Sequence, residues 1–233
     1  MLSQSKKINE VAKNDFSEES ACNYEQKCLC VLVLDVSGSM NGTPIVELNR
    51  WLQEFCKEAT DDDVISQRLE VSIITFNDYV TTVQEPALVE NFTIPTLEAN
   101  GESAIINAVN EAIDKVQARK DWYKSIGPLY YRPNIILMTN KKLGNSQDVN
   151  NLASRIKADT AAKRYVFCPI CVEDVNIPEL NKIAGSIPAM SLKEVKFSQF
   201  FNHWIGVELN VAYSTEDEKV TLEESNDWTN ILI

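Results

Sequence analysis

The stretch CLCVLVLDVSGSMNGTP, residues 28–44, decides the fold of this chain. It begins with an unbroken apolar run, 28–34, which is typical of a strand buried on both faces of a parallel sheet. Asp35 follows this run and therefore lies at the carboxyl end of the predicted strand. Ligands of open α/β sheets bind at that edge, so we expect Asp35 to belong to a binding site.

The polar loop after the strand carries hydroxyl groups at every second position. Gly38 permits a tight turn, and alternate positions can direct Asp35, Ser37 and Ser39 toward one point. A carboxylate and two hydroxyls offer only oxygen atoms, which are the ligands that hard divalent cations such as Mg²⁺ prefer. The loop therefore predicts part of a metal site.

A helix should follow the loop at once. Thr43 is expected to cap it, with Pro44 as its first residue, the position that proline tolerates best. Apolar residues then recur at helical spacing, which predicts a helix packed on the sheet; they are Ile45, Leu48, Leu52, Phe55 and Ala59. The acidic run 61–63 is expected to end this helix.

The rest of the chain alternates between strand and helix patterns. Strands are predicted at 69–76, 134–139 and 165–172, with edge strands at 79–83 and 189–192. Helices are predicted at 105–116, 149–162, 178–184 and 197–211. This alternation predicts an α/β, doubly wound, Rossmann-like fold, with a mostly parallel sheet, one antiparallel edge strand, and helices on both faces.

Composition limits the classes of function. A chain of 233 residues, 44% of them hydrophobic, can bury one sizeable core. Its net charge of −12 disfavours nucleic acid and anionic membranes as partners. No apolar segment has the length of a signal peptide core or a membrane span, so we expect a soluble, cytoplasmic protein. Its six cysteines are too few for a disulfide scaffold and are expected to be reduced.

We predict three parts along the chain. Residues 1–27 form a polar N-terminal arm, and 28–213 form the folded domain. Residues 214–233 form an acidic tail, whose end is apolar. We hypothesise that this apolar end docks on the domain or on a partner.

Five sequence segments resemble a known family. Residues 35–39, DVSGS, match the D-x-S-x-S signature of von Willebrand factor type A domains, whose adhesion site holds Mg²⁺ and binds a partner's carboxylate. Four further segments are similar to the cytoplasmic TerY-like branch, which is associated with tellurium resistance; they are 37–49, 71–78, 131–140 and 197–207. The resemblance covers roughly residues 28–211.

This resemblance implies two further metal ligands. The family places a threonine before the second long helix and an aspartate after the fourth principal strand. Here Ser103 and Asn140 stand at these positions, so a hydroxyl is kept and a charge is lost. With Asp35 as the single carboxylate, bound Mg²⁺ would keep about one positive charge, which weakens metal affinity but strengthens attraction for an incoming acid. Mn²⁺ and Ca²⁺ are the alternative ions.

The resemblance implies a cytoplasmic adaptor that captures an Asp or Glu of a partner protein, with a kinase or phosphatase of a stress-resistance or tellurite-resistance system as the expected partner. Residues next to the metal ligands are expected to contact that partner; they are Gly38, Met40, Asn41, Gly101, Glu102 and Lys141. Two alternatives stay open. One is a metal-free regulatory subunit, in which the loop side chains bond one another, and the other is a metal-dependent phosphatase or hydrolase.

The cysteine and histidine residues do not indicate enzymatic activity. Cys168 and Cys171 have the spacing of a redox pair but lie along a predicted strand, where residues three apart face opposite sides. We therefore expect them to pack in the core. His203 is the only histidine and has no nucleophile motif near it. We expect no catalytic residue.

Overall fold

One mixed sheet organises the molecule. The computed structural model describes residue 16 and residues 23–91, 94–143, 146–172 and 177–191. Within these ranges six strands form a sheet in the order β3-β2-β1-β4-β5-β6. Every neighbouring pair is parallel except β2 and β3, which are antiparallel. The strands are β1 (Cys28–Asp35), β2 (Leu69–Phe76), β3 (Val80–Leu88), β4 (Asn134–Thr139), β5 (Val166–Cys171) and β6 (Met190–Ser191).

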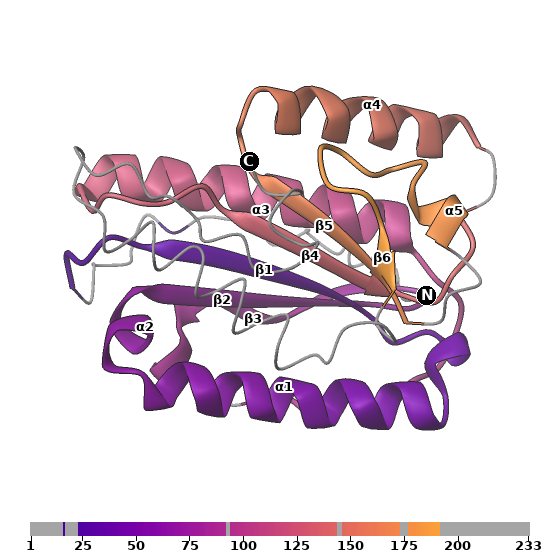
Figure 1. Ribbon diagram of the computed structural model, residues 1–233, viewed down its shortest axis with the longest axis horizontal. Coiled ribbons are helices and arrows are strands. Elements are labelled where there is room, and N and C mark those ends of the chain that lie inside the picture. The colour runs from indigo at the N-terminus through magenta and orange to yellow at the C-terminus, as the bar shows by residue number, and fades with distance from the viewer. Residues whose placement is uncertain (1–15, 17–22, 92–93, 144–145, 173–176, 192–233) are drawn as a thin grey trace, which may run out of the picture.

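Helices cover both faces of this sheet (Figure 1). On one face lie α1 (Thr43–Asp61) and α2 (Asp63–Arg68), and on the other lie α3 (Ile105–Ile126), α4 (Gln147–Ala161) and α5 (Ile177–Leu180). Two 3-10 turns, η1 (Gly38–Met40) and η2 (Val89–Asn91), follow β1 and β3. The predicted doubly wound α/β fold with one antiparallel edge strand is confirmed.

The apolar run of β1 supplies both halves of the core. Alternate residues Cys30, Leu32 and Leu34 pack in the cluster beneath α1, whereas Leu29 and Val33 pack in the cluster beneath α3 and α4. All eight residues of β1 are buried. Burial of each large aliphatic side chain contributes roughly 1.5–3 kcal/mol. The central position of β1 therefore explains why its sequence has no polar interruption.

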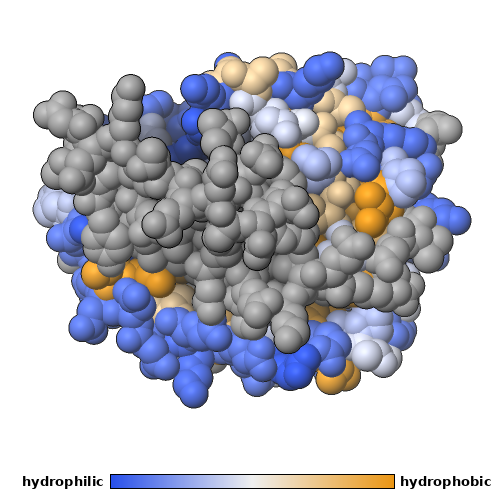
Figure 2. Space-filling view, in the orientation of Figure 1, coloured by the Kyte–Doolittle hydropathy of each residue, from blue (hydrophilic) through white to orange (hydrophobic). Residues whose placement is uncertain are grey.

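The start of α1 differs from the prediction. Gly42, and not Thr43, precedes the first helical residue, and Thr43 itself begins the helix with Pro44 next. Gly42 has a φ of 87°, a backbone conformation that residues with a side chain rarely adopt. The expected buried face is confirmed, with Leu48 and Leu52 in the core. The opposite face carries exposed polar residues, which form part of the hydrophilic lower rim of Figure 2.

The acids at 61–63 end one helix and begin another. α1 ends at Asp61 as predicted, but α2 then starts at Asp63. The Asp62 carboxylate accepts hydrogen bonds from the N–H groups of Val64 and Ile65. Aspartate at this position satisfies amides that a helix start leaves unpaired. α2 was not among the predicted helices, because the acidic run was interpreted only as a helix break.

The antiparallel edge strand is longer than predicted. β3 extends from Val80 to Leu88, whereas the pattern predicted only residues 79–83. Pro86 lies within it, which an edge strand tolerates because one side of its backbone needs no partner. The pairing with β2 shifts register on either side of Ile73.

A buried ion pair lies at the amino end of β2. The Arg119 guanidinium donates to both carboxylate oxygens of Glu70, at 2.8 and 3.0 Å. The Tyr123 hydroxyl donates to Glu70 at 2.5 Å, and the Trp122 ring lies 3.7 Å from the guanidinium carbon. Phe16 packs against this group. These contacts fix the end of α3 against the sheet.

Several predicted segments lie outside the described residues. They are most of the arm at 1–27, the helix at 197–211 with His203, and the tail at 214–233. The described end of the arm contacts the domain, since the Lys27 backbone bonds to the backbone on both sides of Tyr130. Lys27 itself is buried.

Candidate functional site

Asp35 is held at the carboxyl edge of the sheet by two strands. It is fully buried at the end of β1, the strand between β2 and β4. Its Oδ1 accepts a hydrogen bond from the Ser37 N–H at 2.8 Å, and its Oδ2 accepts one from the Thr139 hydroxyl at 2.5 Å. The register that pairs Leu34 with Met138 places Thr139 beside Asp35. The carboxylate is therefore fixed before any ligand arrives.

The two serine hydroxyls of the loop lie together, as their spacing predicted. The Oγ atoms of Ser37 and Ser39 are 3.0 Å apart. Ser37 is buried and Ser39 is exposed, so this pair leads from the core to the surface. Met40 corrects one expectation, because its side chain is fully buried in the core beneath α1 and is not available to a partner. Gly38 and Asn41 stay at least partly accessible.

The loop before α3 is tied to this first loop. Gly38 N–H donates to the Gly101 carbonyl at 2.9 Å, and Asn100 N–H donates to the Val36 carbonyl at 2.8 Å. Ser103 follows, and its Oγ is shielded from solvent without a hydrogen-bond partner among the described residues. A buried hydroxyl in this condition costs free energy unless a ligand or ion pairs with it.

Asp78 shapes the same loop from the β2–β3 turn. Its carboxylate accepts a hydrogen bond from the Glu102 N–H at 3.0 Å. Gly101 beside it has a φ of 72°, and a Cβ there would lie 2.2 Å from an Asp78 carboxylate oxygen. Only glycine fits both conditions. Asp78 was not among the predicted site residues, although its place after β2, at the edge where Asp35 lies, was an available signal.

The third segment follows β4. Asn140 comes directly after Thr139 and is half-buried. Lys141 N–H donates to the Thr139 hydroxyl at 3.0 Å, while the Lys141 ammonium forms an ion pair with Glu102 at 3.1 Å. Backbone and side chain of Lys141 thus link the end of β4 to the loop before α3. A joint role of Ser103 and Asn140 in one coordination sphere stays a prediction.

The donor atoms at this edge fit a hard cation. Asp35, Ser37, Ser39 and Ser103 supply oxygens only, and each Asp35 oxygen keeps acceptor capacity beyond its one protein bond. Within the described ranges no cluster of three or more His, Cys, Asp or Glu side chains could hold a metal. A metal site at this edge would therefore depend on hydroxyl oxygens around one carboxylate.

The cysteines pack in the core. Cys168 lies in the cluster beneath α1, and Cys171 lies in the cluster on the other face, so the two thiols point to opposite sides of β5. Burial raises the pKa of Cys168 to about 12. Such a thiol is protonated at neutral pH and is a poor nucleophile or metal ligand. The expectation of core packing is confirmed.

In the ranges that the structure covers, no helix combines the length and the apolar character that crossing a bilayer requires.

One comparison with known proteins identifies the family. The model of the von Willebrand factor type A domain matches residues 30–202. A search of curated proteins finds no match. Many solved structures resemble the chain, and three of them are described here. A mutant of the PilB minor pilin from Streptococcus sanguinis has a TM-score of 0.60 at 12% identity, over 82% of this chain and 64% of that one.

The ArnB paralog VWA2 from Sulfolobus acidocaldarius has a TM-score of 0.51 at 17% identity, over 76% of this chain and 44% of that one. An aerotolerance-related membrane protein from Bacteroides fragilis has a TM-score of 0.51 at 14% identity, over 79% of this chain and 99% of that one. The chain thus spans less than two thirds of the pilin and less than half of VWA2, and identities this low support the fold alone.

The family model covers most of the chain, and the sheet order, the D-x-S-x-S loop after β1 and the helices on both faces all agree with it. The chain belongs to the von Willebrand factor type A domain family.

Proposed function

We propose that this chain is a protein-binding adaptor that captures an acidic side chain of a partner through a metal ion. Asp35, Ser37, Ser39 and Ser103 would hold the ion, with Asn140 beside them. Domains of this family mediate protein–protein interactions and commonly bind a metal ion at this motif. The observation that carries the proposal is the Ser103 hydroxyl next to the loop of Ser37 and Ser39, which is buried and has no hydrogen-bond partner among the described residues.

Charge favours capture of an acid from outside. A dication beside the single carboxylate of Asp35 keeps about one positive charge. When bound, the ion would supply a Lewis-acidic site for a carboxylate. The protein's own part is to fix Asp35 through Thr139, and to present the exposed Ser39 hydroxyl toward solvent. Mg²⁺ is the proposed ion, with Mn²⁺ and Ca²⁺ as alternatives.

We propose binding rather than catalysis at this site. Among the described residues the hydroxyl of Ser37 bonds only to that of Ser39, and no basic side chain activates either. A nucleophilic serine needs an adjacent base. The phosphatase or hydrolase alternative lacks that support.

The proposed setting follows from the sequence resemblance. Because four segments resemble the TerY-like branch, we propose a role in tellurite or stress resistance, with a kinase or phosphatase of the same system as partner. We propose a cytoplasmic location on the same ground.

One observation favours a metal-free regulatory domain as the second candidate. Both Asp35 oxygens already accept hydrogen bonds from Ser37 and Thr139, so the carboxylate is satisfied without an ion. In that case the loop would serve as a fixed protein surface, and partner binding would not depend on metal.

Affinity capture separates the two candidates. Immobilised wild-type chain, the Asp35→Ala variant and an EDTA-treated sample are compared for the partners they retain from cell extract. Glu58→Ala, an exposed change on α1, is the control. The adaptor proposal expects one partner to be lost with Asp35→Ala and with EDTA but kept by the control. A partner retained in every sample would support the metal-free domain and contradict metal capture.

A further inference from the structure

The chain contains two Asn-Gly pairs, and both lie in the loops that form the candidate metal site. Asn41 and Gly42 lie between η1 and α1, and Asn100 and Gly101 lie in the loop before α3. Asparagine before glycine is chemically labile, because the glycine nitrogen can attack the asparagine side chain without a side chain of its own in the way. The two pairs have the same chemistry, so their surroundings decide which of them reacts.

Asn41 and Gly42 are open to this reaction. Both residues are exposed, and the Asn41 side chain forms no hydrogen bond within the described part of the chain. The Gly42 N–H, which carries the attacking nitrogen, is likewise without an acceptor in the described ranges. Asn41 has a ψ of 144°, so the peptide that follows it must rotate before the attack. No described atom lies within 4 Å of the Cβ position at Gly42, which leaves room for this rotation.

Asn100 and Gly101 are instead held in place. The Asn100 N–H donates to the Val36 carbonyl at 2.8 Å, and the Asn100 side-chain oxygen accepts a bond from the Asn77 side chain at 2.6 Å. On the other side of the peptide, the Gly101 carbonyl accepts a bond from the Gly38 N–H at 2.9 Å. Rotation of this peptide requires such bonds to break, so ring closure meets a higher barrier here.

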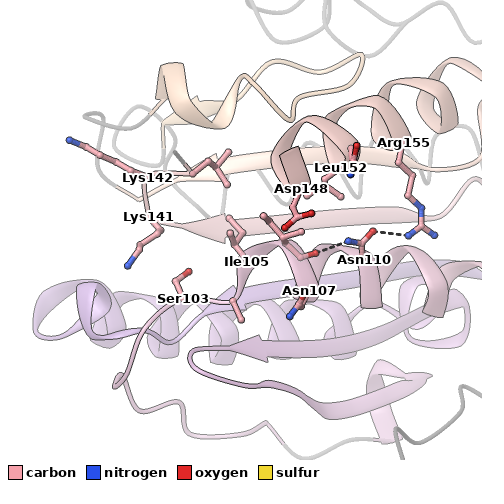
Figure 3. Close-up of a pocket in the computed structure, with 13 residues that line it drawn as sticks. Ser103, Ile105, Asn107, Asn110, Lys141, Lys142, Asp148, Leu152 and Arg155 are labelled. Carbon is pink, nitrogen blue, oxygen red and sulfur yellow. Dashed lines mark hydrogen bonds between the residues drawn. The ribbon is translucent and has the colours of Figure 1, made fainter. Parts of the chain in front are cut away.

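Two further asparagines near the site are protected by a helix. Asn107 and Asn110 lie in α3, where they line a polar groove between α3 and α4 (Figure 3). The N–H that follows Asn107 is bonded within the helix backbone. The Asn110 side chain donates to the Ile106 carbonyl at 3.0 Å and accepts a bond from Arg155 at 2.7 Å, and both bonds are dashed in Figure 3. An amide that is bonded in this way is not available for the reaction.

We propose that Asn41 is a site of spontaneous deamidation. The Gly42 nitrogen attacks the side-chain carbonyl carbon of Asn41, and a new C–N bond forms. The bond from that carbon to Nδ2 breaks, and ammonia leaves with the proton of the Gly42 N–H. Water then opens the cyclic imide at either of its carbonyl groups, which leaves an aspartate or an isoaspartate. No atom is oxidised or reduced, and solvent water is the one co-reactant.

The product carries a new carboxylate in the loop of Ser37 and Ser39. The Asn41 Nδ2 lies 3.9 Å from the Cβ position at Gly38, so the side-chain amide lies close to the backbone of that loop. The consequence for binding rests on the proposed function. A second carboxylate besides Asp35 strengthens the attraction for Mg²⁺ and reduces the positive charge that is left to attract a partner's acid. Deamidation would thus favour metal retention over partner capture.

Peptide mass spectrometry of the folded, full-length chain tests the modification after incubation at mildly alkaline pH. Asn41 should react about tenfold faster than Asn100, because the bonds that hold Asn100 add to its barrier. In urea the two pairs should react at similar rates. Asn77→Ala, which removes one bond to Asn100, should accelerate the reaction at Asn100, and Asn41→Gln should stop it at position 41. Equal rates at the two pairs in the folded chain, or a faster reaction at Asn100, would overturn the proposal.

Titration with Mg²⁺ tests the consequence separately. Asn41→Asp should bind Mg²⁺ about threefold more tightly than wild type, because the added carboxylate attracts the ion. Gln53→Glu, the same charge change on the exposed face of α1, should leave the affinity unchanged. Equal effects of the two variants would overturn the influence of this position on the metal site. Absence of Mg²⁺ binding from wild type and from both variants would overturn metal capture, whereas the modification of Asn41 is decided by mass spectrometry alone.

Discussion

The hydroxyl of Thr139 donates a 2.5 Å hydrogen bond to the buried carboxylate of Asp35, across two neighbouring parallel strands. This contact fixes the one acid of the candidate metal site at the carboxyl edge of the sheet. Its removal should therefore affect both stability and metal affinity.

We expect Thr139→Val to lower the free energy of unfolding by about 1–3 kcal/mol, because a buried carboxylate loses a donor without a change in side-chain shape. Urea unfolding at neutral pH measures this loss. Thr75→Val is the matched control, since the Thr75 hydroxyl makes only a long 3.4 Å bond in β2. Equal effects of the two variants would show that the Thr139 bond has no special role.

The ion pair of Glu70 and Arg119 should dominate the stability of the opposite end of the sheet. Both side chains are almost fully buried, at 4% and 3% exposure. Arg119→Met should cost about 3–5 kcal/mol, because it leaves the Glu70 charge buried without its partner. Arg50→Met, which removes the exposed pair with Glu47, should cost less than about 1 kcal/mol. Denaturant unfolding of the two variants measures both losses of stability. Similar losses would contradict a dominant contribution of the Glu70–Arg119 pair.

Gly101→Ala should disturb the loop that carries Ser103. A left-handed backbone costs a residue with a side chain about 1–2 kcal/mol. The new Cβ also displaces the Asp78 carboxylate, which then loses its bond to the Glu102 N–H. Gly42→Ala isolates the backbone effect, since Gly42 has φ 87° and no atom of the described residues lies within 4 Å of its Cβ position. Thermal unfolding should show a larger loss of stability for Gly101→Ala than for Gly42→Ala. Equal losses would contradict a role of Asp78 in shaping this loop.

The buried thiols should be inert in the folded chain. Burial raises the pKa of Cys56 and of Cys168 to about 12. In a Cys22→Ser background we expect no rapid modification by a thiol reagent at pH 8, and five thiols after unfolding, because all five described cysteines are buried and none forms a disulfide within the described residues. Modification of the native protein at the same rate as the unfolded one would contradict the core assignment.

The same pKa shifts set the direction of a pH dependence. The unfolded thiols release protons near pH 9, whereas the folded thiols keep them up to about pH 12. The unfolded state therefore binds fewer protons between these values, and the thiols make stability fall as pH rises through this window. Replacing Cys56 with alanine should flatten that part of the profile of unfolding free energy against pH.

The central strands could be predicted from sequence because a strand that is buried on both faces has an unbroken run of apolar residues. The run before Asp35 and the run at 69–76 contain the residues that the structure places in β1 and β2. Asp35, Ser37 and Ser39 could likewise be grouped, since a single loop brings them together.

Contacts that depend on pairing between distant segments could not be predicted. Thr139 looked like the last residue of a buried strand, and only the register of β4 with β1 brings its hydroxyl to Asp35. Asp78 lies in a turn whose partner loop begins some twenty residues later, so its bond to Glu102 leaves no local pattern. The Glu70–Arg119 pair was missed for the same reason, because a charged residue inside a strand shows its partner only in three dimensions.

Calorimetric titration with Mg²⁺ tests metal capture at the sheet edge most directly. Wild type should bind one ion weakly, in the millimolar range. Asp35→Ala should abolish binding, and Asn140→Asp should tighten it by about tenfold or more, because a second carboxylate near the ion adds more than 1 kcal/mol of attraction. Heat of binding that is absent from wild type and from Asn140→Asp, or unchanged in Asp35→Ala, would contradict a metal site built on Asp35.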